Sequence, residues 1–285
     1  MKLLNTLKKG KEQLGKEALD HIIGFVKSQQ TDKEAFIDKS GKTDLYYTFF
    51  GWMLSYILGI RPDHQKTGAY LSEQHMESMD LIHYVAFIHC MILRKLWKTG
   101  KAGFILRKLL SLPVRQLQDI KEYPHNNMYS PYSRFIWLSL LEDTGHTIPD
   151  KNEILEDLSF YKTSGGGYAN VRETDSATTN ATVAALAVRG QLEGYEVNED
   201  IQFLRELQNS SGGFSATGNA PVPDLLSTAT SLFMLKCYNL QPTFSPNDFI
   251  EAHWLDSGGF AGTLLEEKSD VEYTFYGLLA LGTMN

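Results

Sequence analysis

The sequence contains few cysteines and no long hydrophobic run. Only Cys90 and Cys237 occur among the 285 residues, and both lie in apolar segments. Two such thiols are typical of a buried core and do not make a disulfide framework. No stretch of about 18 uncharged apolar residues is present, so no transmembrane helix is predicted. The apolar run after Met1 is too short for a signal peptide. We therefore expect a cytoplasmic protein, with peripheral membrane association as the alternative.

The sequence also lacks an excess of positive charge. Its net charge is −7, which argues against general affinity for nucleic acids, so no nucleic-acid partner is expected. One segment departs from this balance, because residues 81–118 contain no Asp or Glu. Within it, the basic and apolar residues of 94–116 are typical of a segment that contacts a membrane surface. The alternative is an ordinary outer helix with solvated lysines and a leucine stripe toward the core.

Several catalytic signatures are missing as well. The glycines at 165–167 are not followed by Lys and Ser or Thr, so they do not form a phosphate-binding loop. The sequence has no Asp-Asp-x-x-Asp run for magnesium diphosphate, no Gly-x-Ser-x-Gly elbow and no Cys-Gly-Glu-Gln element. No cofactor is therefore predicted.

What the sequence does contain is an internal repeat in its C-terminal half. A Ser-Gly-Gly-aromatic turn, followed by an Asp and a Thr four residues later, occurs at residues 164–179, 211–228 and 257–274. The three aspartates, Asp175, Asp224 and Asp270, are 49 and 46 residues apart. A period of this length indicates stacked supersecondary units.

Each unit is predicted to be an outer helix, the glycine turn, a polar loop and an inner helix. The outer helix carries charges, as in residues 199–207, whereas the inner helix is apolar almost all round, as in 271–281. A helix that is apolar on all sides is buried. The Asp at the start of each inner helix is a suitable N-cap.

The same pattern is weaker in the N-terminal half, where inner helices are predicted to begin near residues 44, 80 and 130. Six hairpins with parallel inner helices can close into a ring whose end repeats cover one another. The sequence therefore predicts an all-α fold, a closed ring of about six helical hairpins. It is expected to form one domain over residues 1–285, with an N-terminal lead helix at residues 1–20.

These repeats resemble the terpenoid cyclase and protein prenyltransferase superfamily. Residues 44–51, 211–229 and 257–278 carry the resemblance, which extends over nearly the whole chain. It implies an α/α toroid around a central apolar cavity that holds a hydrophobic isoprenoid substrate. It also implies that the reactive groups lie where the inner helices begin, at one mouth of the ring.

Parallel inner helices direct the positive ends of their dipoles toward this mouth, where anionic groups are favoured. The acidic residues predicted there are Asp44, Asp80, Asp175, Asp224 and Asp270. For each of them, a helix cap with no part in any chemistry is the alternative. His83 follows Asp80 closely enough to join the mouth, although a core or capping histidine is the alternative. Tyr47 and Trp52 are predicted to line the cavity with other aromatic residues of the inner helices, some of which only pack.

The resemblance to protein prenyltransferases implies a zinc site built from an Asp-x-Cys pair and a His on the next inner helix. Asp224 matches the Asp, but Leu226 occupies the Cys position and Tyr273 the His position. Two of the three ligands are missing, so no metal site is predicted.

The resemblance to class II terpene cyclases implies an Asp-x-Asp-Asp-Thr run whose middle Asp protonates an alkene or an epoxide. Residues 270–274 keep a carboxylate in that position, Glu272. A Glu in this apolar helix either pairs, has a raised pKa or points to solvent at the rim. We interpret Glu272 as a candidate general acid, with Asp270 and Tyr273 as its partners.

The first interpretation is therefore a metal-independent, class II-like terpene cyclase or isomerase that protonates a polyprenyl substrate. One alternative is a protein similar to a prenyltransferase β-subunit with a degenerate zinc site. The other is a non-catalytic toroid that binds a lipid or a partner protein.

Overall fold

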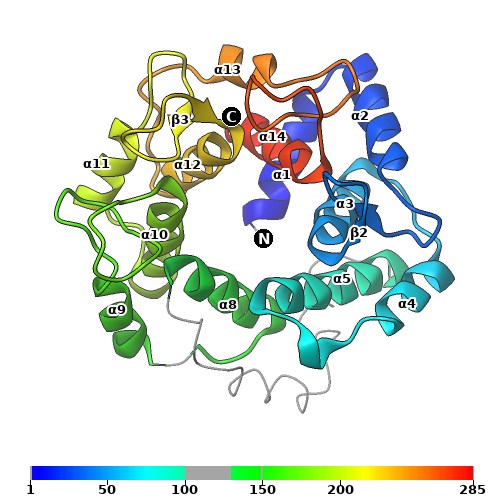
Figure 1. Cartoon of the computed structure of the whole chain (residues 1–285), viewed down its shortest axis with the longest axis horizontal. Coiled ribbons are helices and arrows are strands. Elements are labelled where there is room, and N and C mark those ends of the chain that lie inside the picture. The colour runs from blue at the N-terminus through cyan, green and yellow to red at the C-terminus, as the bar shows by residue number, and fades with distance from the viewer. Residues whose placement is uncertain (1, 100–129, 149, 285) are drawn as a thin grey trace.

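The computed structural model describes residues 2–99, 130–148 and 150–284. These residues form a ring of helices (Figure 1). The inner helices are α3 (Leu45–Leu58), α5 (Leu81–Thr99), α8 (Pro131–Thr144), α10 (Thr179–Glu193), α12 (Leu225–Cys237) and α14 (Val271–Thr283). Each inner helix contacts the next, and α14 contacts α3. The ring is closed, and the predicted α/α toroid is confirmed.

A second set of helices surrounds the inner ring (Figure 1). In the described ranges these are α2 (Lys16–Ser28), α4 (His64–Ser72), α9 (Lys151–Ser159), α11 (Glu199–Glu206) and α13 (Asn247–Ala252), with a 3₁₀ turn, η1, at Met76–Ser78. Helix α1 (Lys2–Gln13) lies inside the circle and packs against α14 and α3. The lead helix predicted for residues 1–20 ends earlier than predicted, at Gln13. Gly15 is extended and caps α2, which begins at Lys16.

The segment predicted to contact a membrane is only partly described. Residues 94–99 are the last turns of inner helix α5, where Arg94 donates to the Thr67 hydroxyl and to the His64 carbonyl. Residues 100–116 lie outside the described residues. No helix in the described ranges is both long and apolar enough to cross a lipid bilayer.

Two of the turns form small antiparallel hairpins before their inner helices. Strand β1 (Phe36–Ile37) pairs with β2 (Thr43–Asp44), and β3 (Phe214–Ser215) pairs with β4 (Pro223–Asp224). In both hairpins the turn aromatic residue is opposite the Asp that caps the inner helix, Phe36 with Asp44 and Phe214 with Asp224. Pairing of this kind fixes where each inner helix begins.

The Thr of each repeat holds the turn aromatic in place. In four repeats the buried threonine Oγ1 accepts the backbone N–H of the aromatic residue, with distances of 2.8–3.1 Å. The pairs are Phe36 with Thr48, Tyr168 with Thr182, Phe214 with Thr228 and Phe260 with Thr274. A buried N–H without a partner is costly, so this bond explains the Thr four residues after each cap.

The position of this bond shows that the start of one inner helix was predicted at the wrong residue. Helix α10 begins at Thr179 and is capped by Thr178, so the helix start predicted at Asp175 is wrong. The exposed Asp175 side chain instead accepts hydrogen bonds from the N–H and hydroxyl of Ser164 in the turn. An Asp three residues before the true cap gave the same Asp-x3-Thr spacing by coincidence. Asp175 therefore closes a loop and begins no helix.

The turn aromatics are among the most buried side chains of the described chain, and two of them pack on a glycine of their inner helix. A Cβ added to Gly51 would lie 2.2 Å from the Phe36 ring, and one added to Gly277 would lie 2.5 Å from the Phe260 ring. The same position, seven residues after the cap, holds Ser231 in the α12 repeat. A small residue there lets the ring lie directly on the helix backbone.

Helices α1 and α14 cross at two further glycines. A Cβ on Gly10 would lie 1.9 Å from the Leu278 carbonyl oxygen, and one on Gly282 would lie 1.8 Å from the Thr6 carbonyl oxygen. Both clashes are with backbone, which no side-chain rotation relieves. The close crossing therefore depends on the two glycines.

We expect Gly10→Ala to lower the free energy of unfolding by about 2 kcal/mol or more, because the methyl group separates α1 from α14. Urea denaturation measures this. Gly24→Ala in α2 is the matched control, since a Cβ added to Gly24 would meet no atom within 4 Å. The control is expected to stabilise by about 0.5–1 kcal/mol through helix propensity. Equal effects of both changes would contradict the close crossing.

We expect Thr228→Val to destabilise the protein by about 1–3 kcal/mol, because the shape is kept and the buried Phe214 N–H loses its acceptor. Thr230→Val is the control. Its hydroxyl donates to the Leu226 and Ser227 carbonyls of its own helix and accepts no backbone N–H of the turn, so a change within about 0.5 kcal/mol is expected. Thermal or urea unfolding of the two variants gives the comparison, and equal losses would show that the turn does not need this bond.

Candidate functional site

The N-termini of the inner helices lie at one end of the ring. Contacts between consecutive repeats place them there: the Tyr46 hydroxyl of α3 meets Glu272 of α14, and His83 of α5 meets Asp44 at the start of α3. The first residues of α10 and α12 bond to the loops that precede the next inner helices. The structure therefore brings Asp44, Asp80, Asp224 and Asp270 to one mouth, whereas Asp175 begins no inner helix.

Glu272 does not point to solvent at the rim. Its Oε1 accepts a hydrogen bond of 2.7 Å from the Tyr46 hydroxyl, and the side chain is partly buried. Burial raises the pKa of Glu272 above its usual range, and the charge of Asp270 raises it further. Tyr46, Tyr47 and Lys39 act in the opposite direction but do not cancel the effect of burial. The interpretation that Glu272 has a raised pKa is the one that the geometry supports.

Asp270 is the second carboxylate of this site and is only 3% exposed. Its Oδ1 caps α14 by accepting the Tyr273 N–H at 2.7 Å. Its Oδ2 accepts no hydrogen bond and lies 3.5 Å from Lys39 Nζ. Burial raises the pKa of Asp270, although the capping bond and Lys39 oppose this rise.

Lys39 links the first repeat to the last. It lies in the β1–β2 hairpin, and its ammonium is 2.9 Å from Glu266 and 4.5 Å from the centre of the Tyr273 ring. The three groups that it contacts, Glu266, Asp270 and Tyr273, all belong to the last repeat. Lys39 therefore holds positive charge against Asp270 at the point where the ring closes.

Aromatic rings surround Glu272. Tyr46 lies edge-on to Phe50 at 4.8 Å between ring centres, and Phe50 contacts Phe275 at 5.0 Å and Tyr276 at 5.8 Å. Burial raises the pKa of the Tyr46 and Tyr276 hydroxyls well above their ordinary value, so they remain neutral donors. Tyr132 at the start of α8 also contacts Tyr46, and burial raises its pKa. Glu272 thus faces an apolar surface with neutral hydroxyls.

The predicted partners Tyr47 and Tyr273 lie beside this surface. Burial raises the pKa of Tyr47 and raises that of Tyr273 to about 12. The Asp224 carboxylate has another role, because its two oxygens accept the N–H and the hydroxyl of Ser227 at 2.8 and 2.7 Å. Burial raises the pKa of Asp224 as well.

The zinc site of protein prenyltransferases does not fit these residues. Both Asp224 oxygens bond to Ser227, Leu226 offers no donor atom, and the Tyr273 ring lies under Lys39. In residues 2–99, 130–148 and 150–284, no three His, Cys, Asp or Glu side chains are placed to hold a metal ion.

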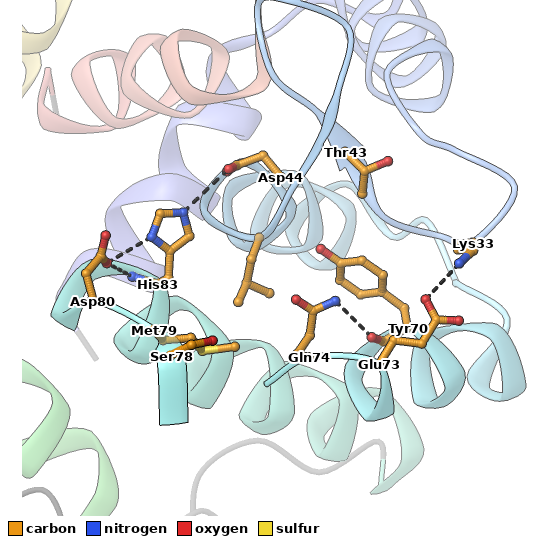
Figure 2. A pocket seen from close by; sticks show the side chains of 11 residues that line it. Lys33, Thr43, Asp44, Tyr70, Glu73, Gln74, Ser78, Met79, Asp80 and His83 are labelled. Carbon is orange, nitrogen blue, oxygen red and sulfur yellow. Dashed lines mark hydrogen bonds and ion pairs between the residues drawn. The ribbon is translucent and has the colours of Figure 1, made fainter. Parts of the chain in front are cut away.

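His83 joins two of the predicted acids, as Figure 2 shows. Its Nδ1 lies 2.8 Å from Asp80 Oδ1, and its Nε2 lies 3.5 Å from Asp44 Oδ2. Burial opposes the charged ring, but the bond to Asp80 and the charges of Asp80 and Asp44 raise the pKa of His83 overall. These three residues form a group of their own in a pocket beside the mouth.

The structure corrects the prediction for Trp52. Its side chain is fully buried, its indole N–H donates to the Glu34 carbonyl at 2.7 Å, and its ring packs edge-on against Trp97. Trp52 therefore packs in the protein core and does not line a cavity. A buried indole needs an acceptor, and the loop before β1 supplies it.

Two site residues were missed from the sequence, Lys39 and Tyr46. Lys39 is an ordinary hairpin lysine whose partners lie 227 residues or more away in the chain. Tyr46 is one of many aromatic residues on the inner helices. Both residues could be recognised only from the closed ring, because it brings the first repeat, which contains Lys39 and Tyr46, into contact with the last repeat.

The comparisons with known proteins agree with this architecture. A family model described as the prenyltransferase alpha-alpha toroid domain matches residues 96–285, about two thirds of the chain. A search of curated proteins finds no match. The matched range includes Asp224, Asp270 and Glu272, whereas Lys39, Tyr46 and His83 join the ring through the contacts described above.

The raised pKa of Glu272 predicts a pH-dependent gain in stability for Glu272→Gln. The folded protein disfavours the charged carboxylate of Glu272. Wild type therefore loses stability as the pH rises from the pKa of this group in the unfolded chain, about 4.3, through its higher pKa in the folded protein. The amide cannot ionise but still accepts the Tyr46 bond. We expect the variant to be the more stable protein at neutral pH and the two proteins to converge near pH 4.

Urea denaturation from pH 4 to pH 8 measures this difference. Glu267→Gln, on the exposed loop before α14, removes the same charge and is the control, for which little change is expected. A Glu272→Gln variant that is less stable than wild type at neutral pH would show that the carboxylate is favourably paired.

Proposed function

Because the chain belongs to the prenyltransferase alpha-alpha toroid domain family, we propose that it acts on a hydrophobic isoprenoid and that Glu272 donates a proton to the substrate. The observation that carries the proposal is a partly buried carboxyl group with a raised pKa, bonded to a neutral phenol among aromatic rings at the mouth of the ring. An acid in such a place keeps its proton to a higher pH than an exposed carboxyl group does.

The two carboxyl groups at the start of α14 have different environments. Asp270 has a backbone N–H, the positive end of the helix dipole and Lys39 beside it, all of which favour its anion. Glu272, in the first turn of the same helix, contacts no cation among the described residues directly and has the phenols of Tyr46 and Tyr47 and apolar rings around it. We therefore assign the proton to Glu272. Asp270 is the negative charge that raises the pKa of Glu272 and so favours its protonated form.

The proposed step is a proton transfer from the Glu272 carboxyl oxygen to one carbon of an alkene. The alkene π electrons form the new C–H bond, which leaves a carbocation on the more substituted carbon and a carboxylate on Glu272. A second alkene of the same chain attacks the cation, and loss of a proton to a base ends the reaction. The rings of Tyr46, Phe50 and Tyr276 can each stabilise the cation by about 1–2 kcal/mol.

Incubation of the full chain with farnesyl diphosphate, geranylgeranyl diphosphate and squalene, followed by gas chromatography and mass spectrometry, tests this function. Glu272→Gln is expected to lower turnover by about 10² or more, the usual contribution of a general acid. Turnover should fall as pH rises through the Glu272 pKa, because the carboxylate has no proton to give. Tyr46→Phe is expected to shift this pH profile, since Tyr46 stabilises the carboxylate.

The control is Glu267→Gln, which leaves the mouth unchanged. Full activity of Glu272→Gln would remove the proposal. Activity that depends on added zinc and is insensitive to Glu272→Gln would favour the alternative of a prenyltransferase-type enzyme.

A non-catalytic lipid-binding toroid is the second candidate, and exposed apolar side chains favour it. Val171, Val222, Leu264 and Leu265 are all exposed and lie on the loops that lead into α10, α12 and α14. Native mass spectrometry distinguishes the two candidates. A retained lipid that neither wild type nor Glu272→Gln converts to a product would support the binding protein.

A further inference from the structure

A pocket of about 660 Å³ lies between the first and second repeats, beside the mouth. The start of α3, the end of α4 and the start of α5 form its walls, with Lys33 from the loop before β1. Glu272 and the rings around it do not line this pocket. Its volume is that of a small-molecule site.

The charged groups of the pocket stand in two sets with a gap between them (Figure 2). His83 lies with Asp44 and Asp80 at one side, and Lys33 pairs with Glu73 at 2.7 Å at the other. Tyr70, Gln74 and Thr43 lie between the two sets in Figure 2.

Tyr70 supplies an observation that is independent of the carboxylates. The residue is 4% exposed and lines the pocket. Its hydroxyl lies 3.5 Å from Thr48 Oγ1, the far limit of a hydrogen bond, and that Thr already donates to the Asp44 carbonyl at 2.6 Å. Burial raises the pKa of Tyr70 to about 12. A neutral phenol with a weak internal partner is thus available to a ligand.

The charge of the pocket selects the kind of ligand. Asp44, Glu73 and Asp80 bring three negative charges, and Lys33 brings one positive charge. The N-termini of α3 and α5 add roughly half a positive charge each. The sum is about one negative charge when His83 is neutral and about zero when His83 is protonated.

We propose that this pocket binds a small organic cation, a primary ammonium or a guanidinium ion. The cation would lie between Asp44 and Glu73 and donate to the oxygen of Tyr70. Its carbon atoms would rest on the apolar side chains of Leu45 and Met79, which also line the pocket. This proposal is independent of the chemistry proposed for Glu272.

His83 makes the binding depend on pH. The groups that face it are Asp80 before its own helix and Asp44 before α3, with Glu73 and Lys33 across the pocket. A protonated His83 pairs with Asp44, one of the two carboxylates that the ligand needs, so the ligand and the proton compete. Affinity is expected to rise as pH increases through the His83 pKa, which lies above about 6.5.

Isothermal titration of the full chain with butylammonium and with butylguanidinium tests the proposal, and 1-butanol is the neutral analogue. Both cations are expected to bind saturably at one site at pH 8, and more weakly at pH 6, whereas butanol does not bind. Asp44→Asn and Glu73→Gln should each weaken binding by about tenfold or more. Asn is as good an N-cap as Asp, so Asp44→Asn keeps helix α3.

Glu77→Gln in η1 is the matched control, because Glu77 is exposed and does not line the pocket. His83→Gln should bind the cations with the same affinity at pH 6 and pH 8, since no group then competes in that range. Equal binding of butylguanidinium and an N-acetylated arginine amide, which carry one positive charge each, would identify a peptide side chain as a fitting source of the cation. Binding of butylguanidinium alone would identify a free small molecule.

The proposal is overturned if neither cation binds to wild type at pH 8. It is also overturned if Asp44→Asn and Glu73→Gln bind as wild type does. Circular dichroism of each variant shows whether a loss of binding reflects a loss of fold. Glu73→Gln changes no residue of the mouth, so the turnover of this variant reports separately on the function proposed above.

Discussion

Helix α14 packs against helix α3, although 226 residues separate Tyr46 from Glu272 in the chain. The inner helices are apolar almost all round, so an open row of hairpins would leave faces of both end helices in water. Closure covers these faces, and α1 adds to it by crossing α14 at Gly10. Lys11 of α1 also donates to the Ile57 carbonyl at the end of α3. The candidate acid exists only in the closed ring, because the last repeat supplies Glu272 and the first supplies Tyr46 and Lys39.

The closed ring also places an unfavourable group in the protein. Two carboxyl groups with raised pKa values, Asp270 and Glu272, share the start of one helix, and one Asp270 oxygen accepts no hydrogen bond. Burial of this kind costs stability unless the charge is well paired. A cation in direct contact with Glu272 would offset the free-energy cost of burial, but it would also lower the pKa of Glu272 and so favour the loss of its proton. Lys39 instead lies against Asp270 and over the ring of Tyr273, so it does not pair directly with Glu272, whose pKa stays raised.

The sequence predicted the architecture because the repeat is long and its turn chemistry is local. The Gly-Gly-aromatic turn, the capping Asp and the Thr that follows all act within about 15 residues, so their spacing can be read directly. Asp175 shows the limit of this reading, because the same spacing arose from a loop residue. Trp52 shows another, since a helical period cannot tell the lumen side from the side that faces the outer helices. Lys39 and Tyr46 depend on contacts between the ends of the chain, which no local pattern contains.

The capping aspartates of the mouth differ in what their second oxygen contacts. In each, one oxygen accepts a backbone N–H of the helix that it begins. The second Asp224 oxygen accepts the Ser227 hydroxyl of the same helix, so its helix uses the whole carboxylate. The second oxygens of Asp44 and Asp270 instead face His83 and Lys39 from neighbouring repeats. A helix cap therefore becomes part of a site only where the next repeat presents a charged group to its remaining oxygen, and the closed ring makes that possible at α3 and α14.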